Sequence, residues 1–225
     1  MTHVSWELII FDCDGVLVDS EPIANRILTR MLNELGLPIS YGETMRAFVG
    51  RSMSSCVEII EERLGRSVPA DFVRTYNARS FAAFEEELQP MPGVTETLQR
   101  IRFPVCVASS ASHEKMRSTL GMTGLLHQFE GRMFSATEVG RGKPDPALFL
   151  HAAKRMSAAP GACAVVEDTV VGVQAGLAAG MSVFGFARAE DPEVLAEAGA
   201  RVFADMSDLA DLLEAHRPSP GSNEL

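Results

Sequence analysis

The sequence lacks the features that mark several large classes of protein. No apolar run approaches the ~20 residues that a membrane-spanning helix needs, and the first residues contain no basic segment followed by an apolar stretch. Cysteine is rare and never forms a Cys-x-x-Cys pair, because the four are far apart at Cys13, Cys56, Cys106 and Cys163. We therefore expect reduced structural thiols and a soluble, cytoplasmic protein that does not bind membranes.

Basic residues are scarce as well. Lys and Arg number 20 against 30 Asp and Glu, which gives a formal net charge of −10. Proteins that bind nucleic acid normally present a basic face to the phosphate backbone, so we expect no nucleic-acid partner. The five histidines form no cluster, and the sequence contains no Gly-x-x-x-x-Gly-Lys-Ser/Thr loop for nucleotide phosphates.

The chain is nevertheless long enough for a substantial core and a small second domain, with 225 residues of which 46% are hydrophobic. Short apolar runs alternate with amphipathic helical stretches over most of it. The expected strands are Leu8–Phe11, Val105–Ala108, Arg132–Phe134, Ala164–Val166, Ser182–Phe186 and Arg201–Phe203. Apolar strands separated by crossover helices predict an α/β fold with a Rossmann-like parallel sheet covered on both faces. We expect a monomer.

One stretch breaks this alternation. Residues 22–88 show helical periodicity without a convincing strand, and glycine or proline punctuates the pattern. An all-helical block inserted after the first strand predicts a small separate domain. We therefore assign residues 1–18 and 90–225 to the α/β core and residues 19–89 to the helical domain.

Two acidic residues follow the first predicted strand, in Phe11-Asp12-Cys13-Asp14-Gly15. Alternation along an extended chain puts the Asp12 and Asp14 side chains on broadly the same side. Ligands of open α/β sheets gather outside the carboxyl ends of the strands, and a divalent cation would offset the repulsion between two neighbouring carboxylates. The alternative is a polar strand end without chemistry.

A second acidic strand end strengthens the metal interpretation. Glu167 and Asp168 directly follow the apolar run Ala164–Val166, so we expect a further carboxylate at the same edge of the sheet. Oxygen-only ligands from separate strands suit Mg²⁺, which keeps several waters and takes few protein carboxylates. A helix cap by Asp168 or Thr169 is the alternative, but it does not explain two adjacent acids.

Two loops offer groups that bind anions. Ser109 and Ser110 follow the predicted strand Val105–Ala108, where a hydroxyl and backbone N–H groups before a helix can bind an anion. Lys143, in Gly142-Lys143-Pro144-Asp145-Pro146, can project a positive charge. Taken alone, the serines could form an ordinary helix N-cap and the lysine could be a solvated loop residue.

Together these motifs resemble the haloacid dehalogenase-like hydrolase superfamily, and they occur in that family's order. The most specific segments are Phe-Asp-x-Asp-Gly-x-Leu-x-Asp-Ser-Glu from Phe11, Gly-Lys-Pro-Asp-Pro from Gly142, and Val-Glu-Asp-x-x-x-Gly-x-x-Ala-Gly-x-x-Ala-Gly-Met from Val166. The helical insert is similar to the small helical cap of the subgroup that contains sugar-phosphate phosphatases and β-phosphoglucomutase. Within that subgroup, Phe-Asp-Cys-Asp-Gly and Lys-Pro-Asp-Pro-Ala-Leu look most like the 6-phosphogluconate phosphatases.

The resemblance implies a Mg²⁺-dependent phosphatase that acts on a small phosphorylated sugar, sugar acid or polyol. Asp12 would attack phosphorus and form an aspartyl-phosphate, since a carboxylate is already ionised at neutral pH. Asp14 would act as general acid and then as general base. The ligands of Mg²⁺ would be Asp12, the backbone carbonyl of Asp14 and Asp168, with Glu167 in support.

The resemblance also implies the groups that bind the substrate. Ser109, Ser110 and Lys143 would hold the phosphoryl oxygens while charge redistributes in the transition state. In the helical cap, Gly50 and Arg51 would contact the remainder of the substrate.

Other activities of the family are alternatives. Dehalogenase relatives lack an acid where Asp14 stands, and relatives that cleave phosphonates use a cap lysine, whereas residues 22–88 contain no lysine. β-Phosphoglucomutase carries a histidine where this chain has Ala24, which weakens the alternative of an isomerase of the mutase type. A non-catalytic sugar-phosphate sensor would usually have lost one of the motif residues, and all of them are present.

Overall fold

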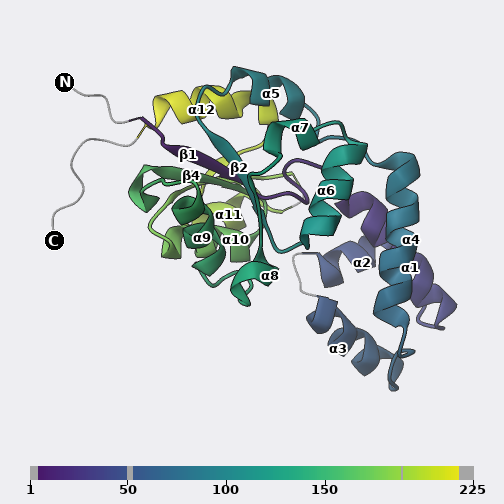
Figure 1. Ribbon diagram of the computed structural model, residues 1–225. Helices are drawn as coiled ribbons and strands as arrows, with labels where there is room; N and C mark the ends of the chain where they lie inside the picture. The colour runs from purple at the N-terminus through teal and green to yellow at the C-terminus, as the bar shows by residue number, and fades with distance from the viewer. Residues whose placement is uncertain (1–4, 50–52, 189, 218–225) are drawn as a thin grey trace. The chain divides into compact units, whose positions relative to one another are not determined.

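The computed structural model describes residues 5–49, 53–188 and 190–217. The chain divides into two compact units, Met1–Val18 with Pro90–Leu225, and Asp19–Gln89. We call the first the core unit and the second the helical unit, and we describe each by itself (Figure 1). Within the described ranges, no helix is both long enough and apolar enough to cross a membrane.

The core unit is built on a six-stranded sheet in which all neighbouring strands run parallel. The strands are β1 (Leu8–Phe11), β2 (Val105–Ser109), β3 (Met133–Ser135), β4 (Cys163–Glu167), β5 (Ser182–Phe186) and β6 (Arg201–Phe203). Their order across the sheet is β3-β2-β1-β4-β5-β6. Every residue of β1 and β4 is buried, as expected for strands covered on both faces. The predicted α/β fold with a Rossmann-like parallel sheet is confirmed.

Helices cover both faces of this sheet (Figure 1). One face carries α9 (Ala147–Arg155), α10 (Val170–Ala178) and α11 (Pro192–Glu197), and the other carries α5 (Val94–Arg100), α7 (Leu126–Phe129) and α12 (Leu209–Ala215). Further helical segments are α6 (His113–Met122), α8 (Ala136–Val139) and the 3₁₀ turns η1 (Pro160–Ala162) and η2 (Met206–Asp208). One continuous cluster of buried side chains joins the strands to α9, α10 and α11.

Glycine lets α10 approach the sheet closely. A Cβ atom added at Gly176 would lie 2.7 Å from Cγ2 of Val183 on β5, closer than Cβ atoms come to other atoms in real proteins. The helix therefore rests directly on the sheet, and its N-terminus is held at the end of β4.

The four cysteines all lie in the described part of the chain, where they are buried and form no disulfide. Burial raises the pKa of the Cys163 thiol to about 12, so this thiol stays protonated at neutral pH. The prediction of reduced structural thiols is confirmed.

The helical unit contains α1 (Glu21–Glu34), α2 (Tyr41–Phe48), α3 (Met53–Leu64) and α4 (Phe72–Glu87). Its apolar cluster includes the buried side chains of Leu32, Phe48, Ile60 and Phe72. Two exposed ion pairs also join α1 to α4, but pairs of this kind contribute at most about 1 kcal/mol each. The apolar cluster therefore holds the helical unit together.

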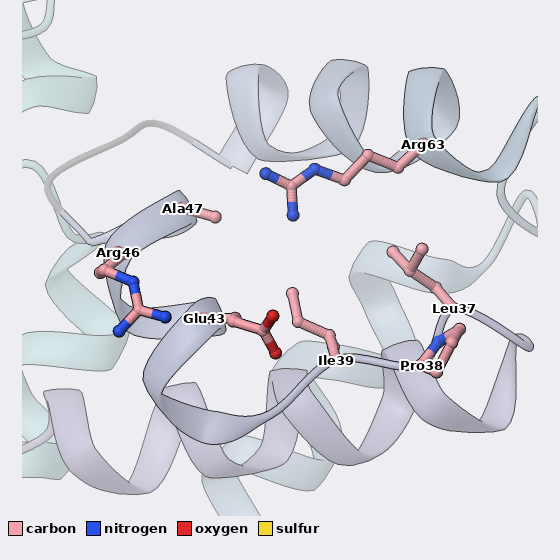
Figure 2. A pocket seen from close by; sticks show the side chains of 7 residues that line it. All are labelled: Leu37, Pro38, Ile39, Glu43, Arg46, Ala47 and Arg63. Atoms are coloured by element: carbon pink, nitrogen blue, oxygen red, sulfur yellow. The ribbon is translucent and has the colours of Figure 1, made fainter.

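A pocket of about 290 Å³ lies within the helical unit (Figure 2). Its lining combines apolar and charged side chains, namely Leu37, Pro38, Ile39, Glu43, Arg46, Ala47 and Arg63. The Arg63 guanidinium reaches over the hollow from α3, and Glu43 lies on α2 (Figure 2). The Glu43 carboxylate accepts hydrogen bonds from the N–H and hydroxyl groups of Ser40. The lining contains no nucleophile beside a base, so we place the candidate active site elsewhere.

Candidate active site

The carboxyl ends of three adjacent strands bring the predicted residues together. Because β1 lies between β2 and β4, the segments that follow these strands share one edge of the sheet. Asp12 follows β1, Ser109 ends β2, and Glu167 ends β4. This edge is where open α/β sheets bind their ligands.

Lys143 joins two of the acids at this edge. Its Nζ atom donates hydrogen bonds to Asp12 Oδ1 at 2.6 Å and to Glu167 Oε1. Only 6% of the lysine side chain is exposed. Burial on its own lowers the pKa of Lys143, but the two carboxylates raise it above its usual value. The ammonium therefore stays charged at neutral pH, and Lys143 is not a solvated loop residue.

Asp12 is a buried carboxyl group whose charge depends on this lysine. Burial raises the pKa of Asp12 to about 7, and the Lys143 ammonium limits the rise. The backbone of Asp12 is fixed to the neighbouring strand, since its N–H donates to the carbonyl oxygen of Val166 at 3.0 Å. The Lys143 ammonium therefore stabilises the charged form of Asp12, whose pKa would be higher without it.

Glu167 is held by the start of α10. Its Oε2 atom accepts hydrogen bonds from the backbone N–H groups of Asp168 and Thr169, each at 3.0 Å, and from the Thr169 hydroxyl at 2.9 Å. A Cβ atom on Gly172 would overlap the Glu167 carboxylate, so only glycine leaves room for it. Both Glu167 oxygens bind protein donors, which makes Glu167 a support for Lys143.

Asp168 lies directly against the loop that follows β1. It is 5% exposed, and a Cβ atom on Gly15 would overlap its Oδ2 atom. Gly15 also has a φ of 79°, a left-handed conformation that favours glycine. The loop backbone and the Asp168 carboxylate are therefore packed together beside Asp12.

This arrangement fits Mg²⁺ better than zinc. In the described ranges, no group of three or more His, Cys, Asp or Glu side chains could hold a metal ion. Zinc needs three or four protein ligands, usually with Cys or His among them. Mg²⁺ keeps several waters and needs only one or two carboxylates. Asp12 and Asp168 offer carboxylate oxygens and the loop after β1 offers backbone carbonyls, and these are the types of donor that Mg²⁺ takes.

Lys115 is a site residue that the sequence analysis missed. Its Nζ atom donates a hydrogen bond to Asp14 Oδ2 at 2.8 Å. The pair is partly open, with 36% of the lysine and 27% of the aspartate side chain exposed. The sequence does contain one feature that could have pointed to Lys115, namely the rarity of lysine. Only three of the 20 basic residues are lysines, and they are Lys115, Lys143 and Lys154. Two of these three contact the acids of the site.

The serine loop leads from β2 into α6. Ser109 is 2% exposed, and its hydroxyl oxygen accepts a hydrogen bond from the N–H of Ala111 at 3.2 Å. Ser110 is exposed. The helix N-cap is Ser112, whose hydroxyl accepts from the Lys115 N–H. Ser112 is therefore the N-cap, so the alternative of an ordinary serine cap in this loop is confirmed at Ser112, and Ser109 does not cap the helix.

A hydrogen-bonded network holds this loop against β3 and α8. The Ser135 hydroxyl donates to the Ala111 carbonyl at 2.7 Å. Glu138 accepts from the Ser135 N–H at 2.7 Å, and its carboxylate also contacts His113 Nε2 at 2.8 Å and His151 Nε2 at 3.3 Å. Burial would raise the pKa of Glu138, but the hydrogen bonds from Ser135 and His113 lower it overall. His113 thus braces the loop through Glu138.

Two predicted residues, Gly50 and Arg51, lie outside the described residues. Ala24, at the position that bears a histidine in β-phosphoglucomutase, is half-buried in α1.

Comparisons with known proteins match this chain to hydrolases and phosphatases. A sequence model of the haloacid dehalogenase-like hydrolase family matches residues 6–180, which include every acid and lysine described above. The chain is 34% identical over 210 residues to the 6-phosphogluconate phosphatase of Escherichia coli K12, covering 93% of this chain and 95% of that protein. It is 29% identical over 215 residues to a phosphorylated carbohydrates phosphatase of Thermotoga maritima, covering 92% and 98%.

A solved structure of similar fold gives the same correspondence over nearly the whole chain. It is a haloacid dehalogenase-like protein of unknown function from Agrobacterium tumefaciens, with a TM-score of 0.86 and 35% identity. The match covers 94% of this chain and 99% of that one. Both units of the chain therefore have counterparts in proteins of known sequence and structure.

Proposed function

Because the chain belongs to the haloacid dehalogenase-like hydrolase family and is a phosphatase, we propose that it hydrolyses a small phosphorylated sugar, sugar acid or polyol. In this proposal Asp12 is the nucleophile and carries an aspartyl-phosphate between the two halves of the reaction. The observation that supports it most is the Lys143 ammonium, which donates to Asp12 at 2.6 Å inside a nearly closed environment. A buried carboxylate whose charge is stabilised by a neighbouring ammonium suits covalent phosphoryl transfer.

The first half of the reaction forms the aspartyl-phosphate. An Asp12 oxygen attacks phosphorus, and the bond from phosphorus to the sugar oxygen breaks with its electron pair on that oxygen. Asp14 donates a proton to the leaving oxygen, which makes the sugar alcohol a stable product. Lys143 stays beside Asp12, and together with Ser109 and Ser110 it binds the phosphoryl oxygens.

The second half returns the enzyme to its starting state. Asp14, now ionised, takes a proton from a water molecule that attacks the phosphorus of the aspartyl-phosphate. The bond from phosphorus to Asp12 breaks, inorganic phosphate leaves, and Asp12 is again a carboxylate. One acid thus serves both half-reactions, with the opposite proton transfer in each.

We propose that Asp12, Asp168 and the backbone carbonyl of Asp14 hold Mg²⁺. When bound, the ion neutralises charge on the nucleophile and on the phosphoryl group. The overlap between Asp168 and a Cβ atom at Gly15 supports this assignment, since it brings the loop backbone and a second carboxylate together.

The class of substrate is inferred from the relatives. The names of the phosphatases from E. coli and T. maritima refer to a phosphorylated sugar acid and to phosphorylated carbohydrates. Such metabolites are charged and stay inside cells, so the proposal also places this enzyme in the cytoplasm.

Phosphate release from a panel of phosphorylated metabolites tests the proposal. The panel includes 6-phosphogluconate, hexose 6-phosphates, hexitol phosphates and a hexose 1-phosphate, each with Mg²⁺ present. A phosphatase releases one phosphate per substrate consumed. Conversion of the hexose 1-phosphate to the 6-phosphate without phosphate release would indicate a mutase, and binding without turnover would indicate a sensor. Either result would overturn the proposal.

A further inference from the structure

Lys115 contacts the proposed proton donor from a rigid position. Its backbone N–H donates to the Ser112 hydroxyl at 3.2 Å, and its carbonyl accepts from the Thr119 hydroxyl at 3.0 Å. Thr119 is fully buried, and its Oγ1 lies 3.9 Å from Sγ of Cys13, the residue before Asp14. The first turns of α6 are thus anchored to the same loop that carries Asp14.

The two lysines at the site differ in what they can reach. Lys143 is 6% exposed and binds the buried acids, whereas Lys115 is 36% exposed and binds Asp14 at the open side. A substrate that enters the site therefore meets the pair formed by Lys115 and Asp14. Lysine is rare in this chain, so the presence of a second lysine at the site is not explained by a surface that is rich in lysine.

The hydrogen bond from Lys115 fixes one oxygen of the Asp14 carboxyl group. A protonated carboxyl group has one oxygen that bears the proton and one that accepts hydrogen bonds, and an ammonium group can only donate. The 2.8 Å hydrogen bond from Lys115 Nζ engages Oδ2 as the acceptor. Lys115 therefore holds the Asp14 carboxyl group in one orientation.

We propose that Lys115 is a positioning residue that fixes the orientation of the Asp14 carboxyl group through Oδ2 and so directs it toward the leaving oxygen. The inference rests on the proposed function, in which Asp14 is the general acid. The bond from phosphorus to the sugar oxygen breaks with its electrons on oxygen, and the Asp14 proton goes to that oxygen. Lys115 keeps its own protons throughout.

The test compares substrates that need this proton with one that does not. In 6-phosphogluconate and sorbitol 6-phosphate the leaving group is an alkoxide, which must be protonated. In p-nitrophenyl phosphate it is a nitrophenolate, which is stable in water. The quantity measured is kcat/KM, because it reports the steps up to formation of the aspartyl-phosphate.

For Lys115→Met we expect kcat/KM to fall by about tenfold to a hundredfold on both alkyl phosphates, as part of the ~10²–10⁴ that a positioned general acid contributes. On p-nitrophenyl phosphate the change should stay within about threefold, because that reaction bypasses the acid. Lys115→Arg keeps a cationic donor and should recover part of the alkyl-phosphate rate. Lys154→Met, at an exposed position on α9, is the matched control and should change neither rate.

Equal losses on all three substrates would overturn the inference, because Lys115 would then act on the phosphoryl group or on folding, and thermal unfolding of the variant tells these two apart. A loss on 6-phosphogluconate alone would also overturn it, since Lys115 would then bind the substrate carboxylate. No loss on any substrate would make the contact incidental. A wild-type enzyme that releases phosphate from none of them would overturn the proposed function itself, and the inference with it.

Discussion

At the scale of single residues, the site depends on charged side chains that are buried next to one another. Transfer of an ion into a protein interior costs several kcal/mol unless partners compensate. Lys143 has two such partners, Asp12 and Glu167, and Glu167 in turn accepts three further hydrogen bonds. The group is therefore stable as a whole, and removal of one member leaves the others without compensation.

Replacement of the lysine should expose this dependence. We expect Lys143→Met to lower the free energy of unfolding by about 3 kcal/mol, because two carboxyl groups stay buried without their cation. Phosphatase activity should fall below detection, since the pKa of Asp12, about 7 with the ammonium in place, would rise further. Urea unfolding and phosphate release at neutral pH measure the two effects, with Lys154→Met as the control. Wild-type activity in Lys143→Met would show that Asp12 does not need this ammonium.

The sequence indicates most of these residues but not Lys115. Asp12, Asp14 and Glu167 each follow an apolar run, so their place at the sheet edge could be inferred from the local pattern. Lys115 reaches Asp14 across 101 residues of sequence, from the helix α6. A contact of this kind depends on how α6 is rotated about its axis, which no local pattern reports.

At the scale of elements, the start of α10 links the fold to the chemistry. Thr169 caps this helix through its hydroxyl, which accepts the Gly172 N–H, and the same hydroxyl donates to Glu167. The helix terminus therefore positions Glu167, which positions Lys143. The glycine at position 172 makes room for this arrangement.

A methyl group at position 172 should disturb the active site through its contact with Glu167. In Gly172→Ala the added Cβ overlaps the Glu167 carboxylate, so the carboxylate or the helix must move. We expect a loss of about 1–3 kcal/mol in stability, typical of overpacking, together with a marked fall in kcat. The control is Gly161→Ala, where a Cβ meets nothing within 4 Å. Unaltered stability and turnover in Gly172→Ala would show that the start of α10 does not position the active site.

The elements differ in how well the sequence predicts them. The bounds of β1, β5 and β6 agree with the expected ranges, because each is a short, mainly apolar segment of the sequence. Helices α5, α7 and α8 were not predicted. Of these, α7 and α8 have only four residues each, which is about one turn and too short to show the period of 3.6 residues.

At the scale of the whole molecule, the net charge opposes the binding of a phosphate ester. The formal charge is −10, yet screening in physiological salt limits such repulsion to about 8 Å. Within that range the charged groups of the site decide the local potential. Lys143, Lys115 and a bound Mg²⁺ would together balance the carboxylates of Asp12, Asp14, Glu167 and Asp168, so the site itself would not repel a phosphate ester.

Binding of Mg²⁺ should therefore stabilise the folded protein. At a hundredfold excess over Kd, a ligand of the native state adds about 2.7 kcal/mol, so the thermal unfolding temperature should rise by several degrees. EDTA should reverse the rise, and Zn²⁺ should give a smaller one than Mg²⁺. In Asp168→Asn the rise should be lost. An unfolding temperature that does not respond to Mg²⁺ would contradict the assigned donor set.

The central claim is that Asp12 carries the phosphoryl group, and trapping of the intermediate tests it most directly. The enzyme is mixed with 6-phosphogluconate and Mg²⁺, quenched in acid and reduced with borohydride, which converts an aspartyl-phosphate to homoserine. Tandem mass spectrometry then locates the modified residue. We expect homoserine at position 12 in the wild-type protein and none in Asp12→Asn, which should be folded and inactive. A modification at any other residue, or phosphate release by Asp12→Asn at the wild-type rate, would contradict the account.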